Sequence, residues 1–322
     1  MKLHLTVMTG LALLGTGGLS AQTRPARDSV VHFTSGAITL EGNLALPEGK
    51  GPWPAVVIIA GSGPTDRNGN SPAGLDSDAY AMLAKGLAER GIASLRYDKR
   101  GLPSSKGSFD HAAVTVSDFA ADAAAGARLL AARKDIGPIA FLGHSEGGLH
   151  ALVAANAGAP ARGLVLVATA GRRPSTLMRE QLARQVPPAL LAQFDTAWAG
   201  YTAEGGEYKA PAGLEVLFVP ANRRFFQSWQ AIDPVDLLRK LSLPALVLQG
   251  ETDLQVTAED ARALGSARPD VKVVMLPGVN HVLKQASGAT VAEQMTAYRD
   301  PSLPLAPGVV PAIADFVLGI RK

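Results

Sequence analysis

The 322-residue chain contains no cysteine. Disulfide bonds, a thiol nucleophile and metal sites built on thiolates are therefore all excluded. The same absence excludes an N-terminus lipidated in the manner of a bacterial lipoprotein, because that modification takes place on a cysteine.

Long apolar runs and clustered charge of one sign are also lacking. Beyond residue 21, no segment of the sequence is apolar for long enough to cross a membrane. The chain has 31 basic and 28 acidic residues, and the basic ones are scattered, as in YDKR and GRRP, rather than gathered into a stripe. Binding to nucleic acid is therefore not expected. With 47% of its residues hydrophobic, the chain has enough apolar material for one large α/β domain or two small domains.

Residues 1–21 have the pattern of a cleavable secretory signal. A short start with Lys2 precedes an apolar stretch at residues 3–19, and the small residues Ser20 and Ala21 follow it. This pattern predicts cleavage after Ala21 and a mature protein in the periplasm or outside the cell, with no stable membrane insertion after processing. The alternative is a retained anchor, which the stretch fits less well because it is slightly shorter than the roughly 20 residues that span a bilayer.

From Val30 onward, short apolar runs alternate with helical patterns. The runs at 30–35 and 38–47 predict an opening antiparallel hairpin. The later runs are apolar throughout, which is typical of parallel strands covered on both faces. They read AVVIIAG (from Ala55), GIASLRYD (from Gly91), PIAFLGHS (from Pro138), GLVLVATAG (from Gly163), PALVLQGETD (from Pro244) and VKVVMLPGVNH (from Val271). Strands that alternate with helices predict an α/β fold with right-handed crossovers and a mostly parallel, doubly wound sheet.

One helical segment, residues 117–134, shows the expected signals at both ends. Ser117 is a candidate N-cap and Asp118 lies in the first turn. Arg133 and Lys134 lie near the end, where cations suit the helix dipole. In doubly wound sheets, ligands and reacting groups gather at the carboxyl ends of the strands. The residues that directly follow the apolar runs are therefore the candidates for a functional site.

Ser145 directly follows one of these runs and lies at the centre of GHSEG. This sequence satisfies G-x-S-x-G, the pattern of an elbow in which a strand turns sharply into a helix and holds a nucleophilic serine in a strained conformation. Larger side chains two residues to either side of the serine would clash, and Gly143 and Gly147 meet that demand. The alternative is a glycine-rich turn with an incidental serine, but the strand before and the helical stretch after it favour a nucleophile.

A serine nucleophile needs a base that removes its proton, and histidine is the usual base. Five of the six histidines lie in the signal, the hairpin, a loop before a helix, or the elbow and its helix, and these are His4, His32, His111, His144 and His150. The two at the elbow are expected to pack or to form hydrogen bonds. His281 instead follows the last apolar run, on a loop at the carboxyl end of the sheet. It is the predicted base.

The base needs an acid that fixes its tautomer, and LVLQGETDLQV offers two carboxylates after a strand. Asp253 is the better placed, because Gly250 ends the strand and the next two residues carry the chain round toward the histidine loop. Glu251 is the alternative. The chain order Ser145, Asp253, His281 is that of α/β-hydrolases and differs from the orders of the two large serine protease classes.

The reaction also needs an oxyanion hole, which is a pair of backbone N–H groups aimed at the charge that develops on the attacked carbonyl. One N–H is expected to be that of Glu146, directly after the nucleophile. The other is expected in the loop after the first core strand, which reads IIAGSGPTDRNGN, and Ser62 is the candidate donor. The glycines of this loop let the backbone approach a substrate closely.

Five stretches together carry a resemblance to a known family: AGSGPTDRNGN, LRYDKRGLPSSKG, GHSEGG, GETDLQV and PGVNHVLK. The chain resembles the α/β-hydrolase superfamily, and within it a group of bacterial serine esterases related to dienelactone hydrolases and serine aminopeptidases. The resemblance extends from Val30 to the C-terminus and is weakest at residues 171–241. It implies the same site residues as the argument above, namely the nucleophile Ser145, the acid Asp253, the base His281 and the oxyanion donors Ser62 and Glu146.

Some positions depart from the family pattern or leave their role open. Ala60 stands where many relatives carry a histidine before the oxyanion glycine. The dienelactone hydrolases proper use a cysteine, which argues against that substrate class here. In RYDKRG, Asp98 and Arg100 are expected to tie loops together. For Asp66 and Arg67, buried ion pairing near the site and recognition of a polar substrate group both stay open.

The strand pattern stops at residues 171–241. STLMREQLARQVPPALLAQFDTAWAGY is helical in period and is followed by proline and glycine breaks and then by RRFFQSWQAIDP. This predicts a helical cap inserted between two parts of the hydrolase core, residues 22–170 and 242–322. Three aromatic residues of RRFFQSWQAIDP either line an acyl pocket or simply pack the cap: Phe225, Phe226 and Trp229.

The sequence therefore predicts a serine hydrolase, specifically a carboxylesterase that cleaves small-molecule esters through an acyl-enzyme, with no metal or organic cofactor. A peptidase acting on small peptides is the first alternative, because the same triad cleaves both kinds of bond. A hydrolase-fold protein that binds ligand without turnover is a further alternative, which the filling of every triad position argues against. The sequence leaves the oligomeric state open.

Overall fold

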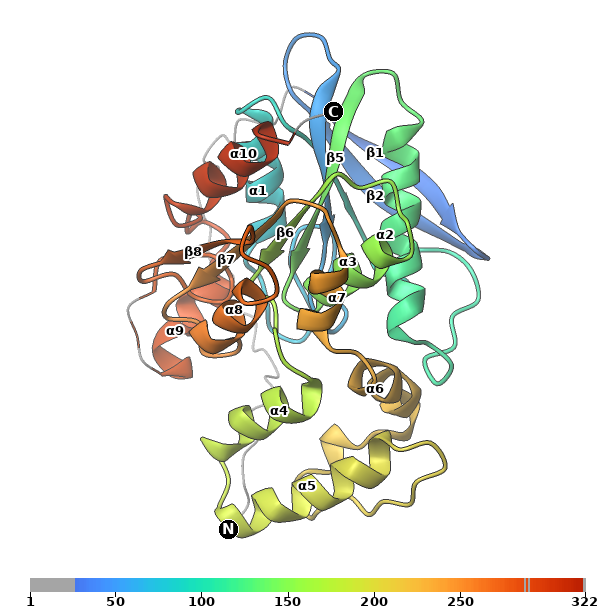
Figure 1. Ribbon diagram of the computed structural model, residues 1–322, viewed down its shortest axis with the longest axis vertical. Coiled ribbons are helices and arrows are strands. Elements are labelled where there is room, and N and C mark those ends of the chain that lie inside the picture. Colours follow the sequence, from blue (N-terminus) through green and yellow to red (C-terminus); the bar gives the residue numbers. More distant parts are fainter. Residues whose placement is uncertain (1–26, 287, 289, 321–322) are drawn as a thin grey trace, which may run out of the picture.

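The structure is a computed structural model that describes residues 27–286, 288 and 290–320. The expected signal at residues 1–21 lies outside these ranges. In the described part, one sheet of eight strands has the order β1-β2-β4-β3-β5-β6-β7-β8 (Figure 1). The strands are β1 (Arg27–Ser35), β2 (Ile38–Leu46), β3 (Trp53–Ile59), β4 (Ala93–Tyr97), β5 (Ile136–His144), β6 (Gly163–Val167), β7 (Ala245–Gly250) and β8 (Lys272–Leu276).

The sheet combines an antiparallel edge with a parallel body. β1 pairs with β2, and β2 with β4, in antiparallel fashion, whereas the pairs from β4 to β8 are all parallel. Every residue of β4, β6 and β7 is buried, as their continuous apolar sequences predict. The predicted α/β fold and the opening hairpin are confirmed. β3 lies between β4 and β5, so the chain changes direction across the sheet there, and ligands bind at such switch points.

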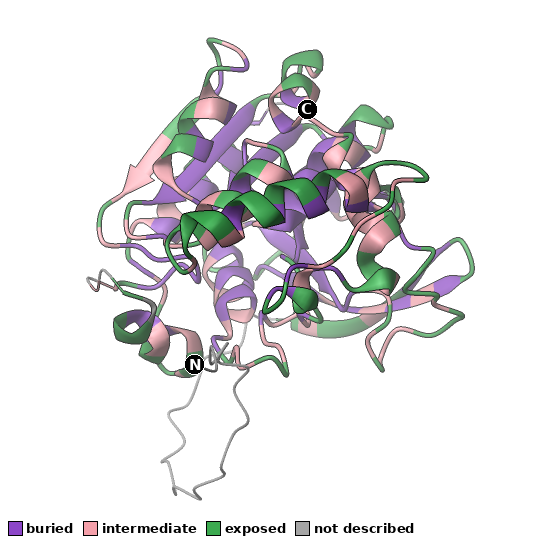
Figure 2. Ribbon diagram, turned by 90° about the horizontal axis from the view of Figure 1, so that it is seen from below, coloured by how far each residue is buried: buried purple, intermediate pink, exposed green. Residues whose placement is uncertain are grey.

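Helices cover both faces of the sheet. The described residues form two large apolar clusters, one between the sheet and α1 and α10, the other between the sheet and α2, α3, α7 and α8 (Figure 1). Figure 2 shows the buried strands inside and the exposed outer surfaces of the helices. None of the helices in the described ranges is long and apolar enough to cross a membrane. Their bounds are α1 (Ala79–Ala88), α2 (Val116–Ala131), α3 (Glu146–Asn156), α7 (Pro234–Lys240), α8 (Ala258–Gly265), α9 (Val291–Arg299) and α10 (Val309–Leu318).

The start of α2 corrects the predicted N-cap. Thr115, and not Ser117, caps the helix, because the carboxylate of Asp118 reaches back and accepts hydrogen bonds from the Thr115 N–H at 2.9 Å and from its hydroxyl at 2.7 Å. The helix also ends earlier than expected. Arg133 lies beyond its last residue and instead forms an ion pair with Asp135 at 2.7 Å.

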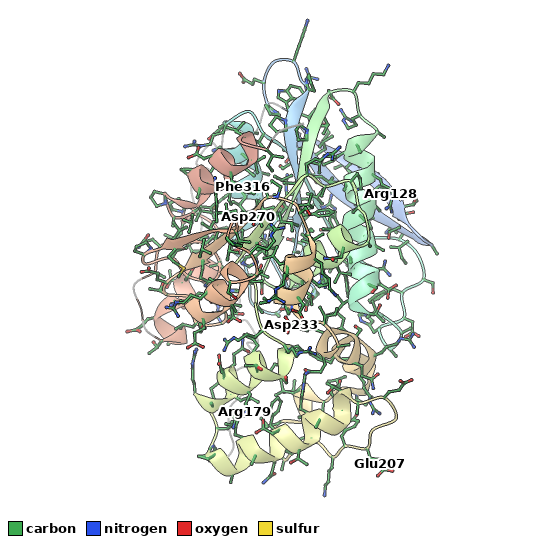
Figure 3. The ribbon with its side chains drawn as sticks, viewed as in Figure 1. Arg128, Arg179, Glu207, Asp233, Asp270 and Phe316 are labelled. Carbon is green, nitrogen blue, oxygen red and sulfur yellow. The ribbon has the colours of Figure 1, made fainter. Side chains whose placement is uncertain are left out.

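Between β6 and β7 the chain forms a helical lobe beyond the carboxyl ends of the strands (Figure 1). We define this lobe as residues 174–230, with α4 (Pro174–Ala183), α5 (Pro188–Thr202) and α6 (Arg223–Gln230). It has an aromatic cluster of its own, and Arg179 on α4, labelled in Figure 3, pairs with Asp195 on α5 at 3.0 Å. The sequence-based division at 171–241 stays a prediction.

The chain returns from the lobe to the core at α7. Asp233, labelled in Figure 3 between the two parts, caps this helix by accepting hydrogen bonds from the N–H groups of Val235 at 3.0 Å and Asp236 at 3.2 Å. Pro234 occupies the first helical position, where its missing N–H has no cost. Leu238 of α7 is buried in the cluster under the sheet, so α7 packs with the core rather than with the lobe.

Candidate active site

The elbow around Ser145 has the strained geometry that its sequence predicts. β5 ends at His144, α3 begins at Glu146, and Ser145 between them has φ 55° and ψ −124°. A Cβ atom on Gly147 would lie 2.2 Å from the carbonyl oxygen of Ile59, so no larger residue fits there. A left-handed φ on a residue other than glycine is costly and recurs at functional sites. The backbone thus presents Ser145 at the switch point between β3 and β5.

His281 and Asp253 lie in contact on the loops after β8 and β7. His281 Nδ1 donates a hydrogen bond to Asp253 Oδ2 at 2.7 Å, and the Asp253 side chain is fully buried. The other carboxylate oxygen accepts from the backbone N–H groups of Gln255 at 2.8 Å and Val256 at 3.0 Å. Glu251, the alternative acid, is exposed to solvent. The structure therefore pairs the histidine with Asp253.

The electrostatics of this pair keep the carboxyl group ionised. Burial raises the pKa of Asp253, but the charge and the hydrogen bond of His281, together with the two backbone N–H groups, outweigh burial and hold the pKa below its ordinary value. An ionised Asp253 can only accept in this hydrogen bond, so the proton stays on His281 Nδ1. The tautomer so selected leaves the other ring nitrogen of His281, Nε2, free to accept a proton.

His144, the residue directly before Ser145, connects the elbow to the loop that carries His281. His144 Nε2 donates to the main-chain carbonyl of His281 at 2.8 Å, and the two rings lie 4.8 Å apart between centroids. In the described structure the Ser145 hydroxyl and the His281 ring do not form a hydrogen bond with each other. Such contacts are often long in free enzymes and tighten when substrate binds.

Tyr80 completes a buried chain of hydrogen bonds behind the site. Burial, and then the charge of His281, lower the pKa of His144 to about 3, so His144 is neutral. Because its Nε2 carries the proton given to a carbonyl, its Nδ1 accepts, and the Tyr80 hydroxyl donates to it at 2.8 Å. The Tyr80 oxygen in turn accepts from the N–H of Gly61 at 3.2 Å. Sequence reasoning expected His144 to form hydrogen bonds but missed Tyr80, which lies 64 positions earlier on α1.

Both predicted oxyanion donors belong to segments that adjoin Ser145. A Cβ atom on Gly61 would lie 3.1 Å from the Ser145 Cβ, so the backbone of the β3 loop packs directly against the elbow just before Ser62. Glu146 is the first residue of α3, at the positive end of that helix. The N–H groups of Ser62 and Glu146 donate no hydrogen bond within the described residues. Two unused donors therefore lie beside the nucleophile.

A buried ion pair flanks these donors. Lys99 Nζ lies 3.3 Å from Glu146 Oε1 and donates to the carbonyl of Gly61 at 2.8 Å. Lys99 also lies over the ring of Phe119, 4.8 Å from its centroid, and His150 stacks on the same ring at 5.1 Å. Burial, and then the charge of Lys99, hold the pKa of His150 well below its ordinary value, so His150 is neutral. Sequence reasoning did not single out Lys99.

A cavity of about 420 Å³ opens beside the two donors. Its walls come mainly from the loops after β3 and β4, from α2 and from α6. They include Ser62 and Glu146 and four phenylalanines, namely Phe109, Phe119, Phe225 and Phe226. Of the three aromatic residues that the sequence singled out in this region, Phe225 and Phe226 line the cavity, which is one of the two roles left open for them. Trp229 does not, because it is buried against Val116 and Leu149. The hollow is a suitable place for an apolar group attached to a carbonyl at Ser145.

Asp66 and Arg67, whose roles the sequence left open, form hydrogen bonds within the protein, and so do Asp98 and Arg100. Arg67 donates from Nη2 to Asp98 at 2.8 Å and to Glu41, and its own N–H donates to Asp98 at 2.7 Å. Asp66 accepts from two backbone N–H groups of its own loop, each at 2.8 Å. Arg100 pairs with Asp122 on α2 at 2.6 Å. The Arg67–Asp98 pair thus holds the loops after β3 and β4 together, and the Arg100–Asp122 pair holds the loop after β4 against α2.

Comparison with known proteins agrees with this architecture. The chain is 30% identical over 261 residues to the esterase EstD of Thermotoga maritima, and the match covers 80% of this chain but only 61% of that protein, less than two thirds of its length. Est1E from Butyrivibrio proteoclasticus, solved with bound ferulic acid, is similar in structure, with a TM-score of 0.59 at 21% identity over 90% of this chain and 98% of that one. A proline iminopeptidase from Mycobacterium smegmatis has a TM-score of 0.58 at 18% identity, again over 90% and 98%.

The similarities to these two structures concern the fold alone, since Est1E and a proline iminopeptidase share it. The alpha/beta hydrolase family model matches residues 56–294. Because that match covers more than half of the chain, including the carboxyl ends of all the strands from β3 to β8, the chain belongs to the α/β-hydrolase family.

Proposed function

We propose that the protein is a serine hydrolase that cleaves carboxylic esters of small molecules through an acyl-enzyme intermediate. The observation that carries this proposal is the strained Ser145 at the switch point, tied through His144 to a His281–Asp253 pair. The similarity to an esterase at 30% identity supports it. A metal or an organic cofactor has no role in this mechanism.

In the proposed reaction, the Ser145 oxygen attacks the ester carbonyl while His281 Nε2 accepts its proton. Asp253 stabilises the imidazolium that forms and keeps the ring in the required tautomer. The negative charge on the former carbonyl oxygen is received by the N–H groups of Ser62 and Glu146. His281 then gives its proton to the departing alcohol. Water enters, loses a proton to His281 and attacks the acyl-enzyme, and His281 then returns that proton to the Ser145 oxygen as the carboxylic acid leaves.

The aromatic cavity is proposed to hold the acyl group. It is lined by the residues of both proposed oxyanion donors and by four phenyl rings, so an apolar group gains from leaving water there. The cavity also bears on the choice between esters and peptides. Among its described lining residues the one carboxylate is Glu146, which is already paired with Lys99. A free N-terminal ammonium group would find no unpaired acid in the cavity, and this favours uncharged acyl groups over small peptides.

A fluorophosphonate probe tests the nucleophile. We expect it to label the wild-type protein once, and Ser145→Ala to abolish labelling and lower kcat by about 10⁴-fold or more. Ser266→Ala is the matched control, because this serine is exposed at the end of α8. Labelling that persists in Ser145→Ala would exclude the mechanism. A panel of p-nitrophenyl esters and aminoacyl-anilides on one preparation decides between esterase and peptidase, since the proposal requires faster cleavage of the esters.

Export is a separate proposal that rests on residues 1–21 alone. If the signal is cleaved as expected, the protein recovered from a bacterial periplasm begins at Gln22. An intact mass that retains the first 21 residues would favour a membrane anchor instead.

A further inference from the structure

Lys99 is a buried cation that the proposed reaction leaves without a role. It lies two residues after the end of β4, and only 7% of its surface is exposed. Its ammonium group has three neighbours: the Gly61 carbonyl at 2.8 Å, the Glu146 carboxylate at 3.3 Å and the face of Phe119. Burying a charge is expensive unless it is well paired, so this arrangement needs a reason.

The carbonyl that Lys99 holds belongs to the same peptide group as the N–H of Ser62. A peptide group is planar and trans, so its C=O and N–H point in opposite directions, and holding one end fixes the direction of the other. The preceding peptide group is held too, because the N–H of Gly61 donates to Tyr80 at 3.2 Å. Both peptide groups of Gly61 are therefore held by buried side chains, which fixes the direction in which the Ser62 N–H points.

The second partner of Lys99 is the residue that carries the other oxyanion donor. Glu146 contributes its N–H at the start of α3, while its carboxylate lies against Lys99. One ammonium group therefore connects the loop after β3 to the helix after β5. A charge-assisted bond to the Gly61 carbonyl also polarises that peptide and makes its N–H a stronger donor. The carboxylate balances the charge, so the buried pair is neutral as a whole.

We propose that Lys99 is a positioning residue of the oxyanion hole, which holds the Gly61–Ser62 peptide and Glu146 so that their N–H groups converge on one oxygen. This inference rests on the proposed function. Lys99 does not touch the reacting atoms but orients the two N–H groups. Because those N–H groups act on the charge that develops in the transition state, loss of Lys99 should lower kcat more than it changes substrate binding.

Lys99→Met tests the proposal, because it keeps an unbranched side chain as far as the ε-carbon and removes the ammonium donor. We expect kcat to fall by about 10- to 100-fold with KM changed less than about 3-fold, since loss of a whole oxyanion donor costs about 10²- to 10³-fold. Arg268→Met is the matched control. Arg268 also donates to a backbone carbonyl, that of Leu243 at 2.6 Å, but at the amino end of the sheet.

Two inhibitors distinguish a loss of oxyanion stabilisation from a general distortion of the binding site. A trifluoromethyl ketone built on the best acyl group adds to Ser145 and places an oxyanion in the hole, whereas the alcohol made by reducing it fills the same cavity without forming one. We expect Lys99→Met to lose about 10- to 100-fold in affinity for the ketone, in step with kcat, and almost none for the alcohol. Equal losses for both ligands, unchanged affinity for both, or the same pattern in Arg268→Met would overturn the proposal.

The double variant Lys99→Met with Glu146→Gln guards against an effect of the unpaired carboxylate. Removing Lys99 alone leaves a buried charge, which lowers stability, and the double variant removes that charge. We expect it to regain thermal stability but not affinity for the ketone. Recovery of ketone affinity as well would show that Lys99 only neutralises Glu146. If the wild-type protein itself shows no preference for the ketone over the alcohol, the proposed function fails first, and this inference with it.

Discussion

His144 donates a hydrogen bond to the main-chain carbonyl of His281 at 2.8 Å, although the two residues are 137 positions apart. The contact attaches the loop that carries the proposed base to the residue directly before the proposed nucleophile. Tyr80 continues this chain of bonds to Gly61, next to a proposed oxyanion donor. Three loops from the ends of three strands are thus held at fixed positions by one buried network.

Loss of the Tyr80 hydroxyl should therefore affect catalysis as well as stability. Tyr80→Phe leaves His144 Nδ1 and the Gly61 N–H without a partner, which we expect to cost about 1 to 3 kcal/mol in the free energy of unfolding and to lower kcat by about 10-fold. Tyr201→Phe is the control, because it removes a tyrosine hydrogen bond to a backbone carbonyl, that of Val219 at 2.6 Å, within the lobe. Steady-state kinetics and urea unfolding of both variants measure the difference. A similar fall in kcat in the control would contradict the role given to Tyr80.

The neutral His144 makes stability depend on pH in a defined direction. Its folded-state pKa of about 3 lies below the ordinary value of 6.5, so between these values the unfolded chain binds a proton that the folded chain does not. The free energy of unfolding should fall as the pH drops through this window, by up to about 1.4 kcal/mol per pH unit for each such group. His150 acts in the same direction, because its pKa is also lowered.

Urea unfolding at pH 7.5, 6 and 4.5 measures this dependence. His144→Phe lacks the titrating group and should show a smaller fall in stability between pH 6 and 4.5 than the wild-type protein. An unchanged slope would mean that His144 is protonated in the folded state over this range, contrary to its lowered pKa.

The contact between His281 and Asp253 predicts which acid the reaction needs. Asp253→Asn should favour the wrong tautomer of His281 and lower kcat by about 10⁴-fold. Glu251→Gln, two residues away and exposed, should have a much smaller effect. Kinetics on one ester substrate decide between them, and the reverse ranking would show that the acid is Glu251.

The aromatic residues of α6 should differ in what they contribute: Phe225 to the choice of acyl group, and Trp229 to the stability of the fold. Phe225→Ala should lower kcat/KM more for long acyl chains than for acetyl esters, because each methylene group buried in the cavity contributes up to about 0.8 kcal/mol. Trp229→Ala should instead destabilise the protein by about 3 to 5 kcal/mol and leave the order of chain lengths unchanged, because Trp229 packs against Val116 and Leu149. A p-nitrophenyl ester series and thermal unfolding test both, and flattened selectivity in Trp229→Ala alone would reverse the assignment.

Local pattern was enough to predict the class of fold and the positions of the candidate site. Continuous apolar runs indicate buried parallel strands, and GHSEG predicts a strand, a sharp turn and a helix within a few residues, so both can be recognised without knowing what packs around them. The ends of the runs also placed His281 and Asp253 at one edge of the sheet. The roles of these residues in a reaction stay predictions until the variants are measured.

The tertiary structure alone decided how these positions are held. Tyr80 and Lys99 lie 64 and 47 positions from their partners His144 and Glu146, and nothing in their own neighbourhood in the sequence distinguishes them from other buried or charged residues. Which aromatic residues of α6 face the cavity likewise depends on how this helix packs against α2, where Ser228 accepts a hydrogen bond from the N–H of Val116 at 3.0 Å. Periodicity and turn patterns reflect bonds between neighbours in the chain, whereas these contacts depend on strand order and helix packing, which bring distant segments together.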